Sequence, residues 1–149
     1  GGRLDRPLWP MSLQHLNPPG LPDWSTLFSQ VVAAEGRLRI VVLSGQVGVD
    51  EQQVLAGDGS YAAQVERAFA NLVVALAAAS VSVADVAKLT LYVVGYEPGK
   101  IGHIRDAVKR HFGDRDLPAC TLIGVQALAR PEFQIEVEAL AIQSLDEGG

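Results

Sequence analysis

The chain has 149 residues, of which 48% are hydrophobic and 19% are charged, and its formal net charge at neutral pH is −5. A chain of this size can bury a substantial core, and its apolar content excludes a disordered chain or a coiled coil. Acidic residues outnumber basic ones, and no cluster of Lys and Arg is present to bind phosphate groups. We therefore expect no nucleic-acid partner and no attraction to anionic membranes.

The scarcity of cysteine and histidine excludes further classes of protein. Cys120 is the single cysteine, so no intramolecular disulfide can form, and a reducing compartment is expected. No CxxC or HExxH motif occurs and the three histidines are scattered, so we expect no metal and no other cofactor. The longest apolar run, residues 72–79, is too short to cross a bilayer. Without a secretory signal pattern at the start, the prediction is a cytoplasmic protein with no membrane partner.

The N-terminal region divides at residue 16. Met11 is the only methionine, and residues 1–10 are expected to be a cloning scar, with an upstream extension as the alternative. Residues 1–16 are therefore assigned to such an extension or scar, and residues 17–149 to a single domain. Residues 17–22, rich in proline, open this domain as a turn-rich lead-in without regular structure.

Two strands are predicted next, over residues 27–34 and 39–47. Residues 35–37, Glu-Gly-Arg, are typical of a hairpin turn between them. Residues 40–43 are continuously apolar, which predicts burial of both faces of the second strand.

An amphipathic helix follows a loop at residues 57–60, with Ser60 as the candidate N-cap. Apolar residues recur at helical spacing along it: Val65, Phe69, Leu72, Leu76 and Ala79. Polar residues lie off that stripe: Gln64, Arg67 and Asn71. The helix should therefore pack one face inward.

The second half of the chain repeats this alternation of strand and helix. Residues 85–94 alternate between apolar and polar side chains, as in a strand. A helix is expected from about Pro98 to Phe112, with Gly113 just after its end and cations in its last turn. Its buried stripe would contain Ile101, Ile104, Val108 and Phe112. Two more strands, residues 119–125 and 133–142, close the chain.

Both predicted helices connect strands of one sheet, and right-handed crossovers would place them on the same side of it. The other side would be bare, although Leu140 and Ile142 lie on it together with Gln134, Glu136 and Glu138. An exposed apolar sheet face usually marks an association surface, and closed symmetric assembly covers such a face. The sequence therefore predicts an oligomer without fixing its number of subunits.

Six short motifs together resemble one known family. They are Phe28-Ser29-Gln30, Leu43-Ser44-Gly45-Gln46-Val47, Asn71-Leu72 within the first helix, Val86-Ala87-Lys88-Leu89-Thr90, Leu117-Pro118-Ala119-Cys120-Thr121 and Ile135-Glu136-Val137-Glu138-Ala139. Their order and spacing, over roughly residues 18–142, are similar to those of the Rid (reactive intermediate deaminase, YjgF-like) family, whose older label is endoribonuclease L-PSP.

The resemblance implies an α+β, chorismate-mutase-like (YjgF-type) fold, with two helices on one face of a mixed sheet. It also implies a homotrimer whose sheets line a central barrel, with ligand clefts between neighbouring subunits. In well-known members these clefts hydrolyse imines and enamines released by pyridoxal-phosphate enzymes, without a cofactor of their own. An RNase activity is attributed to other members.

Carried over residue by residue, the resemblance assigns a candidate site. Its ligand-binding members are Phe28, Gly45, Gln46, Thr121 and Leu122, and its catalytic candidates are Glu136 and Cys120. Two positions depart from the family pattern: Phe28 stands where tyrosine is usual, and Cys120 stands where the family has its catalytic arginine.

Each candidate also has a structural alternative. Glu136 could activate water for addition to a C=N carbon, or Glu136 and Glu138 could both make hydrogen bonds at a subunit interface. Cys120 could be a nucleophile if a nearby cation lowers its pKa, or a small buried hydrophobe. Three residues could supply that charge or base: Arg115, Arg130 and His103. Gly45 could let a backbone N–H approach a ligand, or could mark a β-bulge.

These features predict a divergent Rid-type protein that binds a small metabolite, with hydrolysis of an imine, enamine or related compound as its reaction. The alternative is a non-catalytic ligand-binding or regulatory trimer, and the net charge disfavours RNA cleavage. Without the arginine, activity on 2-iminopropionate should be poor, and the cleft should prefer neutral or apolar ligands unless Arg115 or Arg130 restores the charge.

Overall fold

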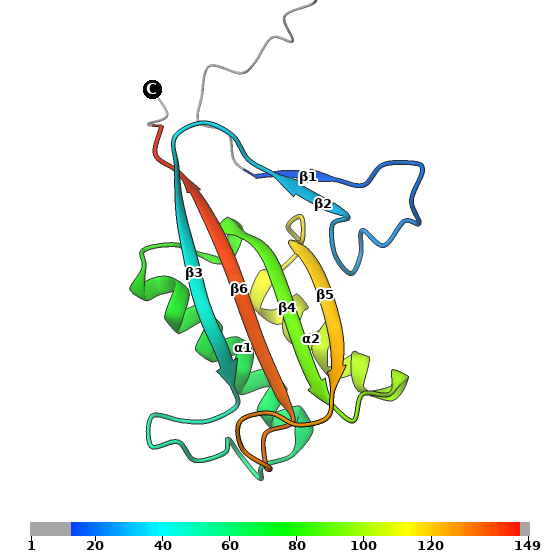
Figure 1. The fold of residues 1–149 in the computed structure, drawn as a ribbon, viewed down its shortest axis with the longest axis vertical. Helices are drawn as coiled ribbons and strands as arrows, with labels where there is room; N and C mark the ends of the chain where they lie inside the picture. The colour runs from blue at the N-terminus through cyan, green and yellow to red at the C-terminus, as the bar shows by residue number, and fades with distance from the viewer. Residues whose placement is uncertain (1–12, 147–149) are drawn as a thin grey trace, which may run out of the picture.

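The computed structural model describes residues 13–146, and Figure 1 shows their fold. The strands are β1 (Gln14–Leu16), β2 (Val31–Ala33), β3 (Leu38–Val47), β4 (Val86–Val94), β5 (Ala119–Val125) and β6 (Ile135–Ser144). The helices are α1 (Tyr61–Ala78) and α2 (Ile101–Phe112), each with a short 3₁₀ turn nearby, η1 (Val83–Asp85) and η2 (Pro98–Lys100). Both long helices and the last four predicted strands therefore lie where the periodicity placed them, within a few residues at each end.

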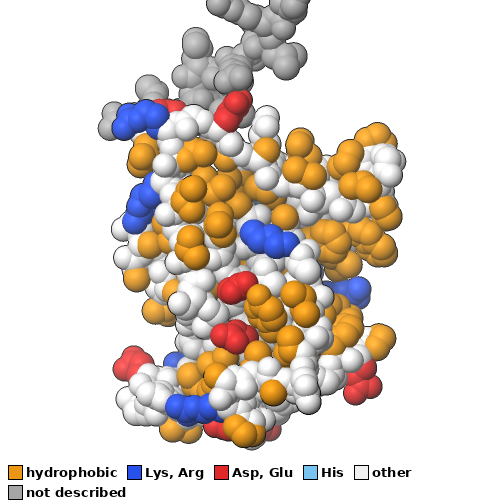
Figure 2. Space-filling model, in the orientation of Figure 1, with side chains coloured by type: hydrophobic (Ala, Val, Ile, Leu, Met, Phe, Trp, Pro, Cys, Tyr) orange, Lys and Arg blue, Asp and Glu red, His pale blue; other side chains and the backbone are white. Residues whose placement is uncertain are grey.

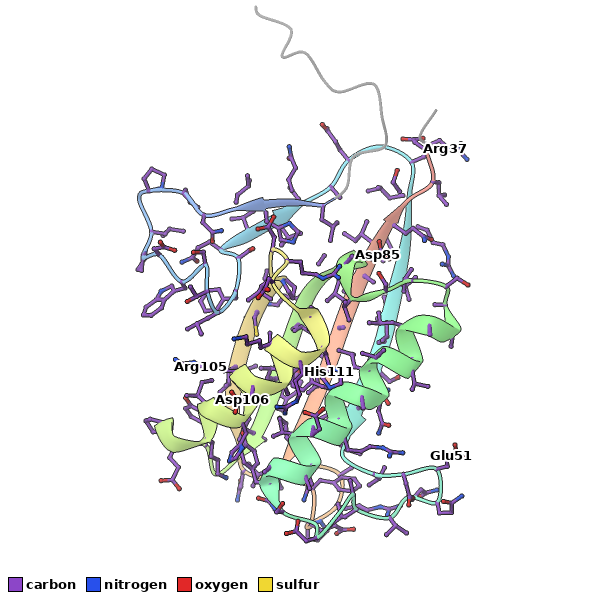
Figure 3. The ribbon with its side chains drawn as sticks, turned by 180° about the vertical axis from the view of Figure 1, so that it is seen from behind. Arg37, Glu51, Asp85, Arg105, Asp106 and His111 are labelled. Carbon is purple, nitrogen blue, oxygen red and sulfur yellow. The ribbon has the colours of Figure 1, made fainter. Side chains whose placement is uncertain are left out.

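The main sheet has four strands in the order β3-β6-β4-β5. The last strand, β6, inserts antiparallel between β3 and β4, whereas β4 and β5 are parallel. Parallel neighbours need a crossover, and α2 provides it. Figures 1 and 3, which view the molecule from opposite sides, show α1 and α2 together on one face of this sheet. The predicted mixed sheet with two helices on one face is confirmed.

The core lies between that face and the two helices. Alternate residues of β6 are fully or almost fully buried there: Ile135, Val137, Ala139 and Ala141. They meet the predicted apolar stripe of α1, whose Phe69 and Leu72 have no exposed surface. Burial of side chains of this size contributes roughly 1.5–3 kcal/mol each. The Ser60 side chain accepts a hydrogen bond from the Ala63 N–H at 3.2 Å, so the predicted N-cap is confirmed.

One polar residue of α1 is buried against expectation. Gln64, placed off the stripe by the sequence pattern, is fully buried. Its amide nitrogen donates to the backbone oxygens of Gly59 and Glu132, and its amide oxygen accepts from the Gln134 N–H at 2.9 Å. A buried amide with all these partners is stable. It ties the start of α1 to the loop before β6, which no local pattern could indicate.

The predicted strand at residues 27–34 is largely wrong, and so is the hairpin after it. Only β2 is extended, and it pairs with β1, which the sequence analysis had assigned to the N-terminal extension, in a separate two-stranded sheet. The cause lies just before β2. Ser29 is buried, its hydroxyl donates to Leu117 O at 2.5 Å, and its N–H donates to Pro118 O at 3.1 Å. These bonds hold the segment beside the start of β5 rather than along β3. The edge of β3 that faces the rest of the sheet is already paired with β6. Residues 1–10 lie outside the described part of the chain.

The face of the sheet without helices carries exposed apolar side chains. Ile40 and Val42 of β3 are 63% and 75% exposed, beside Leu140 and Ile142 of β6. Figure 2 views this face and shows apolar side chains gathered over it, with basic and acidic side chains near its centre. The predicted burial of both faces of residues 40–43 is therefore not achieved within one chain. In the described range, no helix is long and apolar enough to cross a membrane.

Candidate ligand-binding cleft

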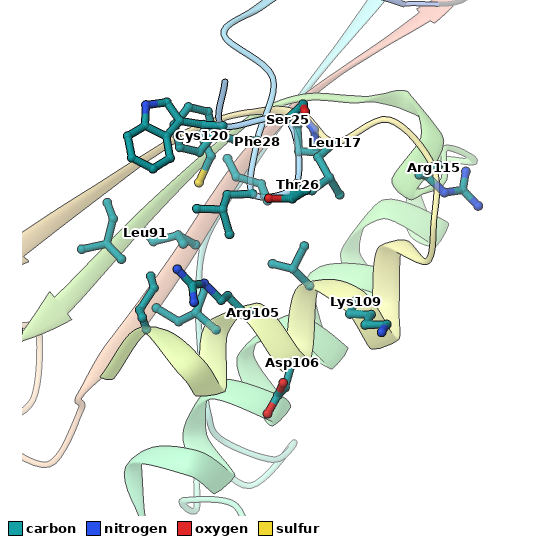
Figure 4. Close-up of a pocket in the computed structure, with 18 of the residues that line it drawn as sticks. Ser25, Thr26, Phe28, Leu91, Arg105, Asp106, Lys109, Arg115, Leu117 and Cys120 are labelled. Atoms are coloured by element: carbon teal, nitrogen blue, oxygen red, sulfur yellow. The ribbon is translucent and has the colours of Figure 1, made fainter. Parts of the chain in front are cut away.

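A cleft of about 940 Å³ opens on the helix-covered side, at the β5 edge of the sheet. Its walls are α2, the inward faces of β4 and β5, and the irregular segment before β2 (Figure 4). Apolar side chains form most of its lining: Trp24, Leu27, Phe28, Leu89, Leu91, Ile101, Ile104, Val108, Leu117, Pro118, Cys120 and Leu122. A largely apolar concavity with a few charged groups at its margin is the usual form of a small-molecule site.

A tight local structure shapes the wall that the N-terminal segment contributes. The Asp23 carboxylate accepts hydrogen bonds from the Ser25 N–H at 3.0 Å and the Ser25 hydroxyl at 2.6 Å, as in an Asx turn. The Phe28 N–H then donates to Trp24 O at 3.0 Å. With Ser29 anchored to the residues before β5, this turn places Trp24 and Phe28 on the cleft.

Cys120 lines the cleft as an apolar group. It is the register partner of Leu89 on β4 and packs against the core. Burial raises the pKa of its thiol to about 11, against a small opposing effect of Lys88. The thiol is therefore protonated at neutral pH, which favours the small-hydrophobe alternative over a nucleophile.

None of the three groups considered as activators approaches this thiol. Arg115 lies at the far end of the cleft in Figure 4, where its Nε donates to Phe112 O at 2.7 Å. Arg130 lies over the Phe133 ring and bonds to Gln53, away from the cleft. His103 is exposed on α2, edge-on to Tyr61 with ring centroids 5.7 Å apart.

The other catalytic candidate, Glu136, lies on the opposite face of the sheet. Its register partner on β4 is Tyr92, which pairs in turn with Ile123 on β5, and all three alternate with residues of the core. Cys120 belongs to the core side by the same alternation. Within one chain, therefore, Glu136 cannot reach a ligand in the cleft beside Cys120.

Gly45 makes a close backbone approach to Glu136. The β3–β6 register shifts between Leu43 and Gln46, so a β-bulge occurs there. A Cβ at residue 45 would overlap the Glu136 carboxylate, so any larger residue would require the Glu136 side chain to move. The bulge alternative for Gly45 is thus observed, and the glycine also makes room for the carboxylate.

The remaining predicted residues divide between the two faces. Leu122 lines the cleft with Phe28, whereas Thr121 points to the helix-free face and its hydroxyl accepts from Lys88 Nζ at 2.6 Å. The Gln46 side chain donates to Ser44 O at 3.1 Å, beside the bulge. Glu138 accepts a hydrogen bond from the Tyr92 hydroxyl at 2.7 Å, which raises the pKa of Tyr92. One chain thus brings together Phe28, Cys120 and Leu122, and separates them from Gly45, Gln46, Thr121 and Glu136.

Sequence reasoning missed the charged residues that α2 brings to the cleft. Arg105 and Lys109 both line it. A signal was present, because Arg105 lies four residues after Ile101 and three before Val108 and therefore borders the predicted buried stripe. Among the residues that the structure describes, no group of three or more His, Cys, Asp or Glu side chains is arranged to hold a metal ion.

A mixed sheet backed by two helices, with an apolar cleft at its parallel edge and a bulged outer strand, defines an α+β domain of the Rid type. The chain belongs to the endoribonuclease L-PSP family, whose sequence profile matches residues 22–143. The family resemblance seen in the six motifs is thereby confirmed.

Individual relatives agree with this assignment. YyfB from Yersinia pestis, a Rid-family protein of unknown function, is 34% identical; the match covers 89% of this chain and all of that one, with a TM-score of 0.81. RidA from an Antarctic Psychrobacter, 24% identical over 86% of this chain and 98% of its own, shares the fold with a TM-score of 0.61. Protein DfrA of Myxococcus xanthus is 28% identical over 115 residues, which are 77% of this chain and 84% of that protein.

Proposed function

We propose that this chain is a divergent Rid-family protein that binds a small metabolite in clefts completed by neighbouring subunits of a homotrimer. The observation that carries the proposal is the apolar cleft beside β5, which Phe28, Cys120 and Leu122 line. The exposed Ile40 and Val42 on the helix-free face support self-association.

Hydrolysis of an imine or enamine is the reaction that family membership favours. Glu136 would act as its acid–base group, orienting water towards a C=N carbon. Because Glu136 and Cys120 lie on opposite faces of one sheet, this role requires assembly to bring Glu136 of one subunit to the cleft of another.

A non-catalytic ligand-binding trimer is the second candidate, and two observations favour it. The Cys120 thiol is protonated, because burial raises its pKa more than Lys88 lowers it, and Arg115 bonds to Phe112 O instead. No guanidinium occupies position 120, where the family has its catalytic arginine. Both observations also predict that 2-iminopropionate is a poor substrate. RNA cleavage is disfavoured by the net charge of −5.

The two candidates are separated by assaying the protein on imines generated in situ from a panel of amino acids, with semicarbazide trapping as the readout. An enzyme should hydrolyse at least one imine, and Glu136→Ala should abolish that activity. A binding protein should leave every imine at its spontaneous rate while still binding ligands by calorimetry. Fast hydrolysis of 2-iminopropionate by the wild type would contradict the inference from position 120, whereas a gain of that activity in Cys120→Arg would support it.

A further inference from the structure

Arg105 presents a positive charge to the cleft. It extends from the side of α2 that faces Cys120 and Leu91, as Figure 4 shows. Ile101 and Val108, its neighbours one turn away on the helix, also line the cleft and hold this side of α2 towards the sheet. Within residues 13–146, no hydrogen bond or ion pair engages its guanidinium.

Three carboxylates also line the cleft, but within the described residues none forms an ion pair with Arg105. The Asp23 carboxylate accepts the two hydrogen bonds from Ser25 at its Oδ1. Asp106 points to the opposite side of α2 in Figure 4, towards Arg110, whose pKa is raised first by Glu66 and further by Asp106. Asp114 lies beyond the end of α2, about 10 Å or more along the helix axis from Arg105.

The α2 wall of the cleft therefore presents a positive charge without an ion-pair partner among the described residues. Lys109 follows Arg105 by one helical turn and also lines the cleft, which adds a second cation on the same wall. A guanidinium presents five donors in a planar fork that fits a carboxylate in two parallel hydrogen bonds. An anionic group of this shape is what this wall would bind.

The opposite wall determines the rest of the ligand. Trp24, Phe28 and Leu122 provide aromatic and aliphatic surface, and the cleft volume of about 940 Å³ far exceeds that of a three-carbon acid. Apolar walls contribute favourable binding free energy only when an apolar part of the ligand covers them. A ligand that satisfies both walls has a carboxylate at one end and an aromatic or branched aliphatic group at the other.

From this arrangement we infer that Arg105 is the carboxylate anchor of the cleft and that the ligand is an organic acid with an apolar body. The inference rests on the proposed ligand-binding function and specifies its ligand class. The anchoring cation is then on α2 and not at position 120 on β5. Arg105 takes the role that the sequence had suggested for two loop residues, Arg115 and Arg130.

Isothermal calorimetry with two isosteric probes, phenylacetate and its neutral analogue phenylacetamide, tests the inference. One charge-assisted bidentate pair should make phenylacetate bind at least about tenfold more tightly than phenylacetamide. Arg105→Gln should remove this preference while leaving the affinity for phenylacetamide unchanged. Arg37→Gln is the matched control, because it removes the same charge at the far end of the molecule (Figure 3) and should preserve the preference.

The outcomes separate the two proposals. Equal binding of both probes to the wild type would overturn the carboxylate anchor and leave the ligand-binding cleft standing. A preference that survives in Arg105→Gln would also overturn it and would transfer the role to Lys109. If neither probe binds, both the anchor and the ligand-binding cleft are refuted.

Discussion

Single residues in this chain carry roles that their chemical type alone would not reveal. Cys120 stands where a catalytic arginine is expected, yet it acts as part of an apolar wall. Gly45 marks a bulge, yet its missing side chain also leaves room for the Glu136 carboxylate. In both cases the neighbouring strand decides the role, because it sets what the residue faces.

Replacing Gly45 by alanine should destabilise the fold. The new methyl would overlap the flexible Glu136 side chain and force it out of its present rotamer, at a cost of about 0.5–1.5 kcal/mol in the free energy of unfolding. Urea denaturation measures this loss. Glu136→Ala in the same chain should restore most of it. Gly102→Ala is the control: its Cβ meets nothing within 4 Å, so this helical position should gain stability. Equal effects at Gly45 and Gly102 would contradict the contact.

Cys120 should react slowly with alkylating reagents. Its pKa of about 11 leaves a thiolate fraction about a hundredfold lower at pH 8 than that of an unperturbed thiol. The folded pKa lies above the unfolded value near 9, so the folded state keeps its proton longer as pH rises. The associated stability is therefore present below pH 9 and is lost as pH rises towards 11. Iodoacetamide kinetics of native against urea-unfolded protein from pH 7 to 10 measures the effect. Equal rates at pH 8 would show the thiol to be accessible and unperturbed.

At the level of elements, the main strands and helices follow from local periodicity, whereas the N-terminal arm does not. The arm consists of β1, β2 and the irregular segment between them, and it is attached through a few polar contacts. Within the arm, Asn17 accepts a hydrogen bond from the Gln30 N–H at 3.0 Å, and Ser29 attaches the arm to the residues before β5. Since the arm supplies one wall of the cleft, its attachment affects the site directly.

Ser29→Ala should loosen this arm. The substitution leaves the buried Leu117 carbonyl without its hydroxyl donor, which costs about 1–3 kcal/mol. Hydrogen exchange should increase for residues 23–29, and affinity for cleft ligands should fall. Ser144→Ala, at the C-terminal end of β6, is the control, because within residues 13–146 its side chain accepts only from the nearby Asp146 N–H at 3.2 Å. Unchanged exchange in the arm would show that Ser29 does not hold it.

At the scale of the whole molecule, a two-layer fold leaves one sheet face uncovered. Helices cover the core side, while Ile40 and Val42 remain exposed beside Leu140 and Ile142. Contiguous apolar surface of this kind favours closed association between identical chains. The proposed intersubunit cleft requires that assembly bring the two separated halves of the predicted site together.

The proposed homotrimer should form in solution, and Val42→Lys should dissociate it. A charge placed at the centre of an apolar interface is costly unless it is paired. Light scattering at micromolar concentration gives the mass. Val74→Lys is the matched control, because Val74 is similarly exposed, at 69%, but lies on α1, away from the bare face. A monomeric wild type would refute the trimer and the intersubunit site together.

The sequence alone determined the features that depend on local spacing. The alternation in residues 85–94 and the apolar stripe from Val65 to Leu76 each bury one side of an element, so their periods identify a strand and a helix. The six motifs, matched in order, identified the family. The Ser60 cap and the helix end at Gly113 were equally local and equally predictable.

Only the tertiary structure decided the features that depend on which segments meet. Ser29 holds the segment before β2 beside the start of β5, and Gln64 is buried because a distant loop supplies its partners. Arg105 reaches the cleft because α2 forms the wall that faces β4 and β5. Strand register likewise puts Cys120 and Glu136 on opposite faces. Packing determines which residues far apart in sequence become neighbours or hydrogen-bond partners. The periodicity of a single segment does not predict them.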